Sequence, residues 1–432
     1  MIQRLIMEIY VVQQEDTIYS IADKFGISVT KLINDNGVNI PYSLVVGQAL
    51  VISHPKQVYV VQEGDTLDGI AEVFHVTINQ LLRNNPDLTN RQFIYPGETI
   101  VISYPSEKGD LWVVGYTYPF IRESTLRKTL PNLTYLLIFN YRITKGGELV
   151  GSDKDISVIQ TAMLYETASS MVVTTFSTTG EFDLEFVYEV LLSEEIQDKI
   201  IESILITLNT KGYKGVNLTF QFINTTNEQL YLNFLTKVTN RLHPEGYYVY
   251  LTLNPGLSYN EDTVVFEKID YTKLSNVSDG ILFLSYDWGT IEHSPDSLLS
   301  IITTSSLLDY IVSQVPIDKI RIAIPTLGYD WKLPYVAGQS KANVINYDSI
   351  MSLAHQTNAI IHYDETSLTA YFEYVDYDMQ QHIVLFKDAR SIDSSLKILQ
   401  SYGINGVGIW NIMYYFPSLW TVINSQYEIV LV

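Results

Sequence analysis

The chain has 432 residues and a formal net charge of −21, with 47% hydrophobic and 17% charged residues. This length and composition indicate a globular protein with a large core and exclude a disordered chain. The acidic balance argues against a nucleic-acid partner, because phosphate backbones bind basic surfaces, and the absence of cysteine excludes disulfides and thiolate metal sites.

The first residues, Met1 to Glu8, do not resemble a signal peptide, because they lack a long uncharged apolar run. Elsewhere no run of about twenty apolar residues is found, so the sequence predicts no membrane span. We therefore expect a protein that does not follow the usual secretory route.

An internal repeat fills the first hundred residues. The segment that begins Tyr10-Val11-Val12-Gln13 recurs as Tyr59-Val60-Val61-Gln62, and residues 46–53 recur at 95–103. Each copy has the pattern of a strand, two helices and a second strand, with apolar residues at helical spacing between the strands. The repeat predicts two βααβ modules, at residues 8–54 and 57–104.

These modules resemble LysM modules, which bind glycans that contain N-acetylglucosamine. The resemblance covers both copies, although Glu15 replaces the turn glycine that the second copy keeps as Gly64. In that family the glycan groove lies between this turn and the loop after the second helix. The resemblance therefore implies glycan contacts by Asp16, Thr17, Ile18, Asn36 and Gly37 in the first module and by Asp65, Thr66, Leu67, Asn85 and Pro86 in the second. The alternative is a pair of modules used only for assembly.

From Trp112 onward, apolar β-rich runs alternate with amphipathic helices, which is typical of a parallel α/β fold. Eight candidate strands begin near residues 112, 134, 171, 216, 248, 280, 320 and 406. Eight βα units predict a (β/α)8 TIM barrel over residues 110–432, with its site at the carboxyl ends of the strands. Short antiparallel strands between the seventh and eighth predict a small α+β insertion at about residues 331–386.

The fourth predicted strand alternates apolar residues with Asn217, Thr219 and Gln221. It resembles, position by position, the strand of family 18 chitinase-like glycosidases that ends in Asp-x-x-Asp-x-Asp-x-Glu. In that family the Glu is the general acid, and the Asp two residues earlier positions the acetamido group of the substrate. Here the four acidic positions hold Lys214, Asn217, Thr219 and Gln221.

Further segments resemble one branch of this family, the LysM-bearing glucosaminidases that act on spore cortex peptidoglycan. They include Tyr286-Asp287-Trp288-Gly289, residues 328–334, residues 386–391 and Trp410. The resemblance covers nearly the whole chain and implies that Trp410 lies under the bound sugar. It implies a cleft in which a glycan could be bound without cleavage by Gln221, Tyr286, Asp287 and Trp410.

Hydrolysis requires a carboxylic acid to protonate the leaving oxygen. Gln221 has no titratable proton, and Thr219 cannot supply a negative charge. We therefore expect that this protein is not an enzyme, and we expect no cofactor and no metal, because the seven His include no spaced ligand pair. The alternative is a relocated acid, for which Asp287 and Asp330 are the candidates.

These expectations favour a non-catalytic glycan-binding or structural protein of the bacterial spore envelope, in the coat, in the exosporium or next to the cortex. It would be deposited from the mother-cell cytoplasm without a signal peptide and would bind peptidoglycan or another N-acetylglucosamine-containing glycan. The 32 Tyr suit self-association or packing against other envelope proteins. The alternative function is a spore cortex N-acetylglucosaminidase with altered catalytic residues.

Overall fold

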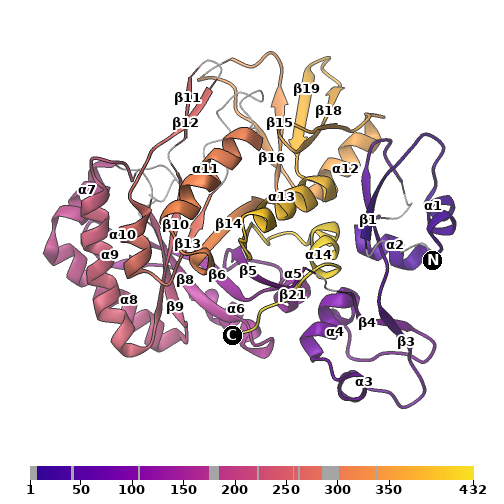
Figure 1. Cartoon of the computed structure of the whole chain (residues 1–432), viewed down its shortest axis with the longest axis horizontal. Helices are drawn as coiled ribbons and strands as arrows, with labels where there is room; N and C mark the ends of the chain where they lie inside the picture. Colours follow the sequence, from indigo (N-terminus) through magenta and orange to yellow (C-terminus); the bar gives the residue numbers. More distant parts are fainter. Residues whose placement is uncertain are drawn as a thin grey trace.

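The structure is a computed structural model, and it shows two small modules on one side of a larger barrel (Figure 1). It describes residues 7–39, 43–105, 108–174, 184–220, 223–255, 257–260, 263–284, 301–336 and 338–432.

Both modules have the expected βααβ order. The first contains β1 (Met7–Val11), α1 (Ile18–Phe25), α2 (Val29–Asn36) and β2 (Ala49–Ser53). The second contains β3 (Gln57–Val60), α3 (Leu67–Phe74), α4 (Ile78–Asn84), the 3-10 helix η1 (Pro86–Asn90) and β4 (Thr99–Ser103). In each module the two strands pair antiparallel. The first helix begins in both at a threonine whose hydroxyl accepts a backbone N–H, so Thr17 and Thr66 are N-caps.

Eight parallel strands close the barrel, as the sequence predicts. They are β5 (Asp110–Thr117), β6 (Tyr135–Ile143), β8 (Ala168–Thr174), β9 (Gly215–Phe220), β10 (Tyr248–Leu253), β13 (Gly280–Phe283), β14 (Ile320–Pro325) and β20 (Gly406–Trp410). Closure comes from β5, which pairs with β20 on one side and with β6 on the other.

Helices surround this barrel. They are α5 (Glu123–Thr129), α6 (Asp155–Leu164), α7 (Leu184–Leu192), α8 (Glu194–Lys211), α9 (Glu228–Leu242), α10 (Tyr271–Val277), α11 (Ile301–Gln314), α13 (Ala389–Ser401) and α14 (Pro417–Asn424). Short elements join them: η2 (Leu130–Asn132), β7 (Leu149–Val150), η3 (His243–Glu245), the β11 (Leu257–Asn260) and β12 (Thr263–Phe266) pair, η4 (Ile317–Lys319) and β21 (Glu428–Ile429).

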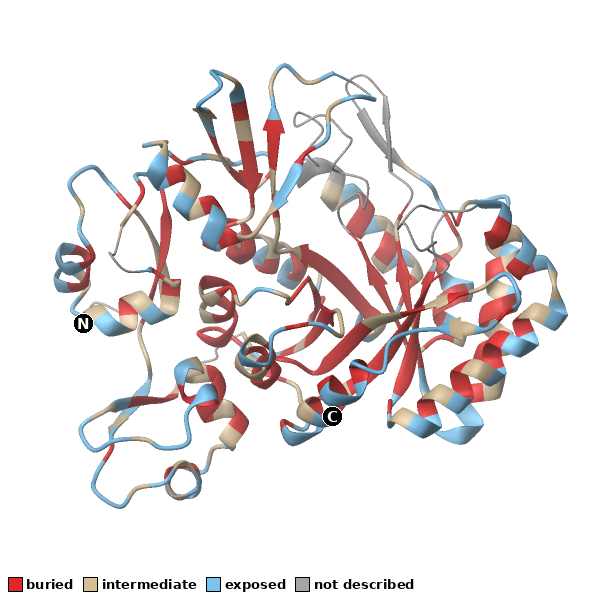
Figure 2. Ribbon diagram, turned by 180° about the vertical axis from the view of Figure 1, so that it is seen from behind, coloured by how far each residue is buried: buried red, intermediate tan, exposed pale blue. Residues whose placement is uncertain are grey.

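The barrel strands are buried on both faces, and Figure 2 shows them as a continuous buried centre. On β9, Val216 and Leu218 belong to the large core that the strands share with the helices. A second cluster fills the inside of the barrel and includes Tyr116, Val172 and Leu282. The period-two alternation of each strand thus separates an outer apolar core from the inner face that carries Asn217.

The insertion forms a five-stranded antiparallel sheet in the order β16-β15-β19-β18-β17. Its elements are β15 (Gly328–Lys332), β16 (Asn343–Ile345), α12 (Tyr347–Gln356), β17 (His362–Asp364), β18 (Thr369–Val375) and β19 (Gln381–Phe386). In Figure 1 this sheet rises from the barrel on the side of α12 and the first module.

Candidate active site

The two described polar residues of β9, Asn217 and Thr219, are both buried. The Thr252 hydroxyl on β10 donates to Asn217 Oδ1 at 2.9 Å, and the Tyr116 hydroxyl hydrogen bonds to the same Thr252 hydroxyl. Burial raises the pKa of Tyr116, so its hydroxyl stays protonated and can donate. Asn217 therefore belongs to a hydrogen-bonded chain that crosses the inside of the barrel.

Thr219 lies directly beside Thr252 in the strand register, but its hydroxyl does not take part in this hydrogen-bonded chain. Its side chain is 6% exposed, and Oγ1 has no hydrogen-bond partner among the residues that the structure describes. Lys214 lies before β9 and is exposed, so it is separated from this inner face. Gln221 lies outside the described residues.

Trp410 ends β20 and forms the centre of an aromatic cluster. Its ring centroid lies 5.0 Å from that of Tyr116, 6.0 Å from Phe139 and 6.3 Å from Tyr118. Trp410 is half-buried, and Tyr118 stacks on the exposed Phe120. Aromatic faces of this kind can pack against the apolar face of a sugar ring. Of the four predicted cleft residues, only Trp410 is described, because Tyr286, Asp287 and Gln221 lie outside the described ranges.

Asp330, one of the two candidates for a relocated acid, lies on β15 of the insertion sheet. Its Oδ1 is 2.8 Å from His382 Nδ1, and the Tyr374 hydroxyl donates to its Oδ2 at 2.9 Å. The Asp330 side chain is only 10% exposed. Both carboxylate oxygens are therefore used within the insertion sheet, which disfavours Asp330 as a proton donor to a substrate.

The predicted polar residues of the modules have structural contacts that repeat in both copies. Asp16 accepts hydrogen bonds from Tyr10 and the Gln13 N–H, and Asp65 accepts the matching pair from Tyr59 and Gln62. The side-chain amides of Asn36 and Asn85 tie the second helix to the returning strand. These residues hold the turns and loops that the expected groove needs, and Ile18 is buried in the core of the first module.

The loop after α2 of the first module is packed against the barrel and the insertion. A Cβ on Gly37 would lie 2.8 Å from Pro417 Cγ, and one on Gly47 would lie 1.9 Å from the Ile361 carbonyl oxygen. The Ile361 N–H donates to the Val46 carbonyl at 2.9 Å. One side of the expected groove in this module is thus covered.

The matching loop of the second module is packed against the barrel in its first part, where Asp87 pairs with Lys128 of α5 at 2.8 Å, but it is open at Gly97. Gly97 corresponds to Gly47, yet a Cβ there would meet nothing within 4 Å. In the same loop, Phe93 has 69% of its surface exposed to solvent and Tyr95 has 59%. Asn85 and Pro86 line a cavity of about 630 Å³ between the two modules and α14. The second module therefore keeps an accessible aromatic surface at this end of the loop.

The described ranges contain no group of three or more His, Cys, Asp or Glu side chains placed to hold a metal ion. Within the same ranges, no helix has both the length and the apolar character needed to cross a membrane.

Two family models account for most of the chain. The model for glycosyl hydrolases family 18 matches residues 113–414, and the LysM domain model matches residues 10–53 and 59–103. The chain belongs to glycosyl hydrolase family 18. This family 18 protein is 34% identical to the cortical fragment-lytic enzyme of Bacillus anthracis, over 98% of this chain and 99% of the relative.

Solved structures agree with this membership. The crystal structure of the Bacillus cereus spore cortex-lytic enzyme SleL has a TM-score of 0.79 and 30% identity, and 99% of each chain is covered. The crystal structure of the Bacillus megaterium enzyme SleL has the same TM-score at 26% identity, with 98% of this chain and 99% of that chain covered.

The comparisons contradict one expectation from the sequence. The substitutions on β9 predicted that the protein is not an enzyme, but relatives over nearly the whole chain are named lytic enzymes, and family 18 is a family of glycosyl hydrolases. The expectation was wrong because it judged the whole protein by one strand. The residues at positions 217, 219 and 221 are Asn, Thr and Gln, and their role in this member stays a question for the proposal below.

Sequence reasoning did not select the aromatic residues around Trp410. Phe139 lies within β6, and Tyr118 and Phe120 directly follow β5. The position of Tyr118 and Phe120 just after the carboxyl end of β5, where barrel sites are built, is the signal that could have identified them, whereas Phe139 lies in the middle of its strand.

Proposed function

We propose that this protein is a glycosylase of spore cortex peptidoglycan that uses catalytic groups other than those of the family motif. The observation that carries the proposal is the similarity to cortical fragment-lytic enzymes over 98% of the chain, because it includes both modules as well as the barrel. The protein would act in the spore envelope. Its location in the coat or exosporium, and its association with itself or with other envelope proteins, stay predictions.

Glycan binding is supported by two separate surfaces. The second module exposes Phe93 and Tyr95 beside its open loop, and the aromatic cluster around Trp410 lies at the end of β20. The first module is packed against the barrel at Gly37 and against the insertion at Gly47. We expect the second module to retain the protein on peptidoglycan and the barrel to bind the sugar that is cleaved.

Hydrolysis needs a proton donor that the described part of β9 does not supply. General acid–base catalysis is commonly worth about 10²–10⁴-fold in rate. Asp330 is engaged by His382 and Tyr374, so the proposal assigns the acid to Asp287, the other candidate from the sequence. We expect turnover well below that of a family member with the complete motif.

The test uses the full chain with de-coated spore cortex and with purified cortical fragments. Mass spectrometry measures released muropeptides, and a gel measures the protein that pellets with the cortex. We expect slow release by the unmodified protein, loss of release in Asp287→Asn, and faster release in the double variant Thr219→Asp/Gln221→Glu, which restores the two inner carboxyl groups of the motif.

Binding is separated from cleavage by variants of the two modules. Phe93→Ala/Tyr95→Ala should reduce pelleting, whereas Tyr19→Ala, at an exposed tyrosine of the first module, should leave it unchanged. If the unmodified protein releases no products from either substrate, the glycosylase proposal is wrong, whatever the pelleting shows.

A further inference from the structure

The cavity of about 630 Å³ between the two modules is closed on its third side by α14, which Figure 1 shows beside α2 and α4. Hydrogen bonds hold this helix against both modules. The Thr421 hydroxyl donates to the Asp35 carbonyl of α2 at 2.9 Å, and Asn424 Nδ2 donates to the Arg83 carbonyl of α4 at 3.3 Å. The volume falls in the usual range for small-molecule sites.

This cavity differs from the groove that the sequence predicts within each module. Of the residues predicted for the second module, Asn85 and Pro86 line the cavity, whereas the turn at Asp65 does not. The first module contributes Thr30 and Asn34 of α2, which are not among its predicted groove residues. A ligand in the cavity would therefore contact both modules and the barrel helix α14 at once.

Every charged side chain in the lining of the cavity has an ion-pair partner. The pairs are Lys31 with Asp35 at 2.8 Å, Arg91 with Glu98 at 2.6 Å, Asp87 with Lys128 at 2.8 Å, and Arg83 with Glu428. A charged ligand would have to compete with these pairs and lose its own hydration, whereas a neutral ligand leaves the pairs intact. The cavity therefore favours a neutral ligand.

Three polar groups in α14 or just before it have no hydrogen-bond partner among the described residues. Asn424 is 5% exposed, and its Oδ1 accepts no hydrogen bond. The Trp420 indole N–H and the Tyr415 hydroxyl are donors without an acceptor. Burial raises the pKa of Tyr415, so its hydroxyl stays protonated. Polar groups of this kind gain from a ligand that pairs with them.

Aromatic residues line the same cavity. They are Tyr104, Tyr415 and Trp420, and both Tyr104 and Trp420 are buried. Aromatic rings pack well against methyl groups and against the apolar faces of sugar rings. An acetamido group offers one N–H donor, one carbonyl acceptor and one methyl group, which matches the unused acceptor, the unused donors and the rings. A neutral N-acetylated sugar has this combination.

We infer that this cavity binds a neutral N-acetylated sugar, whose amide N–H donates to Asn424 Oδ1 and whose amide oxygen accepts from Trp420 Nε1 or the Tyr415 hydroxyl. The inference rests on the proposed function for the source of the sugar, because the glycan of peptidoglycan contains N-acetylglucosamine. The site is separate from the aromatic cluster around Trp410 and from the exposed aromatic surface of the second module.

The test is isothermal titration calorimetry of the full chain with N,N′-diacetylchitobiose, the disaccharide of N-acetylglucosamine. Cellobiose is the matched ligand, because it has the same linkage and carries a hydroxyl in place of each acetamido group. We expect binding of N,N′-diacetylchitobiose. Cellobiose should bind about tenfold more weakly or not at all, because it has no amide to pair with Asn424.

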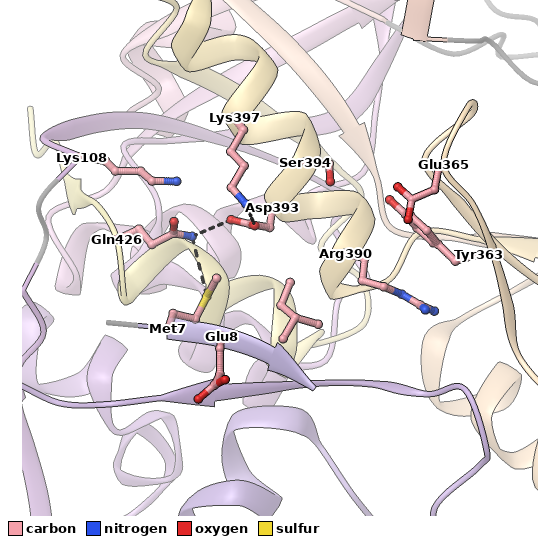
Figure 3. Close-up of a pocket in the computed structure, with 11 residues that line it drawn as sticks. Met7, Glu8, Lys108, Tyr363, Glu365, Arg390, Asp393, Ser394, Lys397 and Gln426 are labelled. Atoms are coloured by element: carbon pink, nitrogen blue, oxygen red, sulfur yellow. Dashed lines mark hydrogen bonds and ion pairs between the residues drawn. The ribbon is translucent and has the colours of Figure 1, made fainter. Parts of the chain in front are cut away.

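Two variants remove the unused donors and keep an aromatic ring at each position. Tyr415→Phe should weaken N,N′-diacetylchitobiose about three- to tenfold, and Tyr415→Phe/Trp420→Phe about tenfold or more, because each change removes a hydrogen bond to the ligand. The matched control is Tyr363→Phe in the separate cavity of about 590 Å³ between the first module, the insertion and α13 (Figure 3). It also removes a tyrosine hydroxyl and should leave binding unchanged.

Tyr415→Phe separates a loss of binding from a loss of stability. This variant should unfold at the same urea concentration as the unmodified protein, because the hydroxyl has no partner in the described part of the chain. Weaker binding at unchanged stability supports the inference. Equal binding by the unmodified protein and the double variant, equal binding of cellobiose, or no binding at all overturns the inference.

The results also separate this inference from the proposed function. Muropeptide release by a protein whose disaccharide binding is unchanged in the double variant would remove the cavity site and leave the glycosylase. Binding that depends on Tyr415 and Trp420 without muropeptide release would do the opposite. Loss of disaccharide binding in Phe93→Ala/Tyr95→Ala alone would place the sugar on the exposed surface of the second module and would also overturn the inference.

Discussion

Two threonines side by side in the barrel show how one residue type can have different roles. Thr252 connects Tyr116 with Asn217, so its hydroxyl holds a chain of buried groups together. The Thr219 hydroxyl has no partner in the described part of the chain. A buried polar group without a partner costs about 1–3 kcal/mol. Position 219 therefore carries a hydroxyl that local packing does not use, at a position for which the resemblance to the family motif predicted a carboxylate.

The same substitution at both positions tests this difference. Thr219→Val should leave the free energy of unfolding unchanged or raise it by up to about 1 kcal/mol, because the hydroxyl that it removes has no partner. Thr252→Val should lower it by about 1–3 kcal/mol, because it leaves Tyr116 and Asn217 without their shared partner. Urea unfolding followed by tryptophan fluorescence measures both values, and equal losses at the two positions would contradict this account.

At the scale of elements, the two modules share one fold but differ in their surroundings. Gly47 and Gly97 precede β2 and β4 with nearly the same left-handed backbone, at φ values of +87° and +88°. Gly47 contacts the Ile361 carbonyl of the insertion, whereas Gly97 faces open space. The same loop is therefore an internal contact in one module and an exposed surface in the other.

An alanine at each of these glycines separates backbone strain from docking. Both changes place a side chain in a left-handed conformation, at a cost of about 1–2 kcal/mol. Only Gly47→Ala also forces Cβ against a backbone oxygen, which should add about 1–3 kcal/mol. Urea unfolding should thus show a larger loss for Gly47→Ala, and hydrogen exchange at the Ile361 amide should rise in that variant alone. If Gly97→Ala lowers the free energy of unfolding as much as Gly47→Ala does, the interpretation that Gly47 is a docking contact is wrong.

At the scale of the whole molecule, the modules and the barrel share one apolar core. This core contains Val45 and Val51 of the first module, Ile70 and Leu81 of the second, and the strands of the barrel. The first module also has a small core of its own around Leu32 and Leu50. The shared core predicts that the modules do not unfold independently of the barrel.

This prediction can be measured with two separate probes. All five Trp lie between residues 112 and 420, so their fluorescence reports on the barrel and its insertion. The chain has no cysteine, so Tyr19→Cys provides a single exposed labelling position in the first module. Both probes should show one urea transition at the same concentration. In a double variant that combines Tyr19→Cys with Gly47→Ala, the label in the first module should report unfolding at a lower urea concentration. Two separate transitions without Gly47→Ala would show that the first module is independent.

Much of the architecture could be predicted because it rests on local patterns. The repeat at Tyr10 and Tyr59 predicted both modules, and the alternation on β9 placed Val216 and Asn217 on opposite faces. The site was less predictable. Trp410 was selected through the resemblance to the family, and its contact with a sugar stays a prediction. Phe139 and Tyr118 join it only through the curvature of the barrel.

The sequence by itself determined the helices and strands, the order of the domains and the absence of carboxylates on β9. These features depend on residue type and on the spacing of residues that are close together in the sequence. Tertiary structure alone decided that the loop at Gly47 is covered while the loop at Gly97 is open, and that Asp330 is engaged within the insertion. Those outcomes depend on contacts between distant segments, such as Gly47 with Ile361 and Asp330 with His382. Such contacts leave no periodic signal in the sequence, because a glycine or an aspartate does not indicate its partner before the distant segment folds against it.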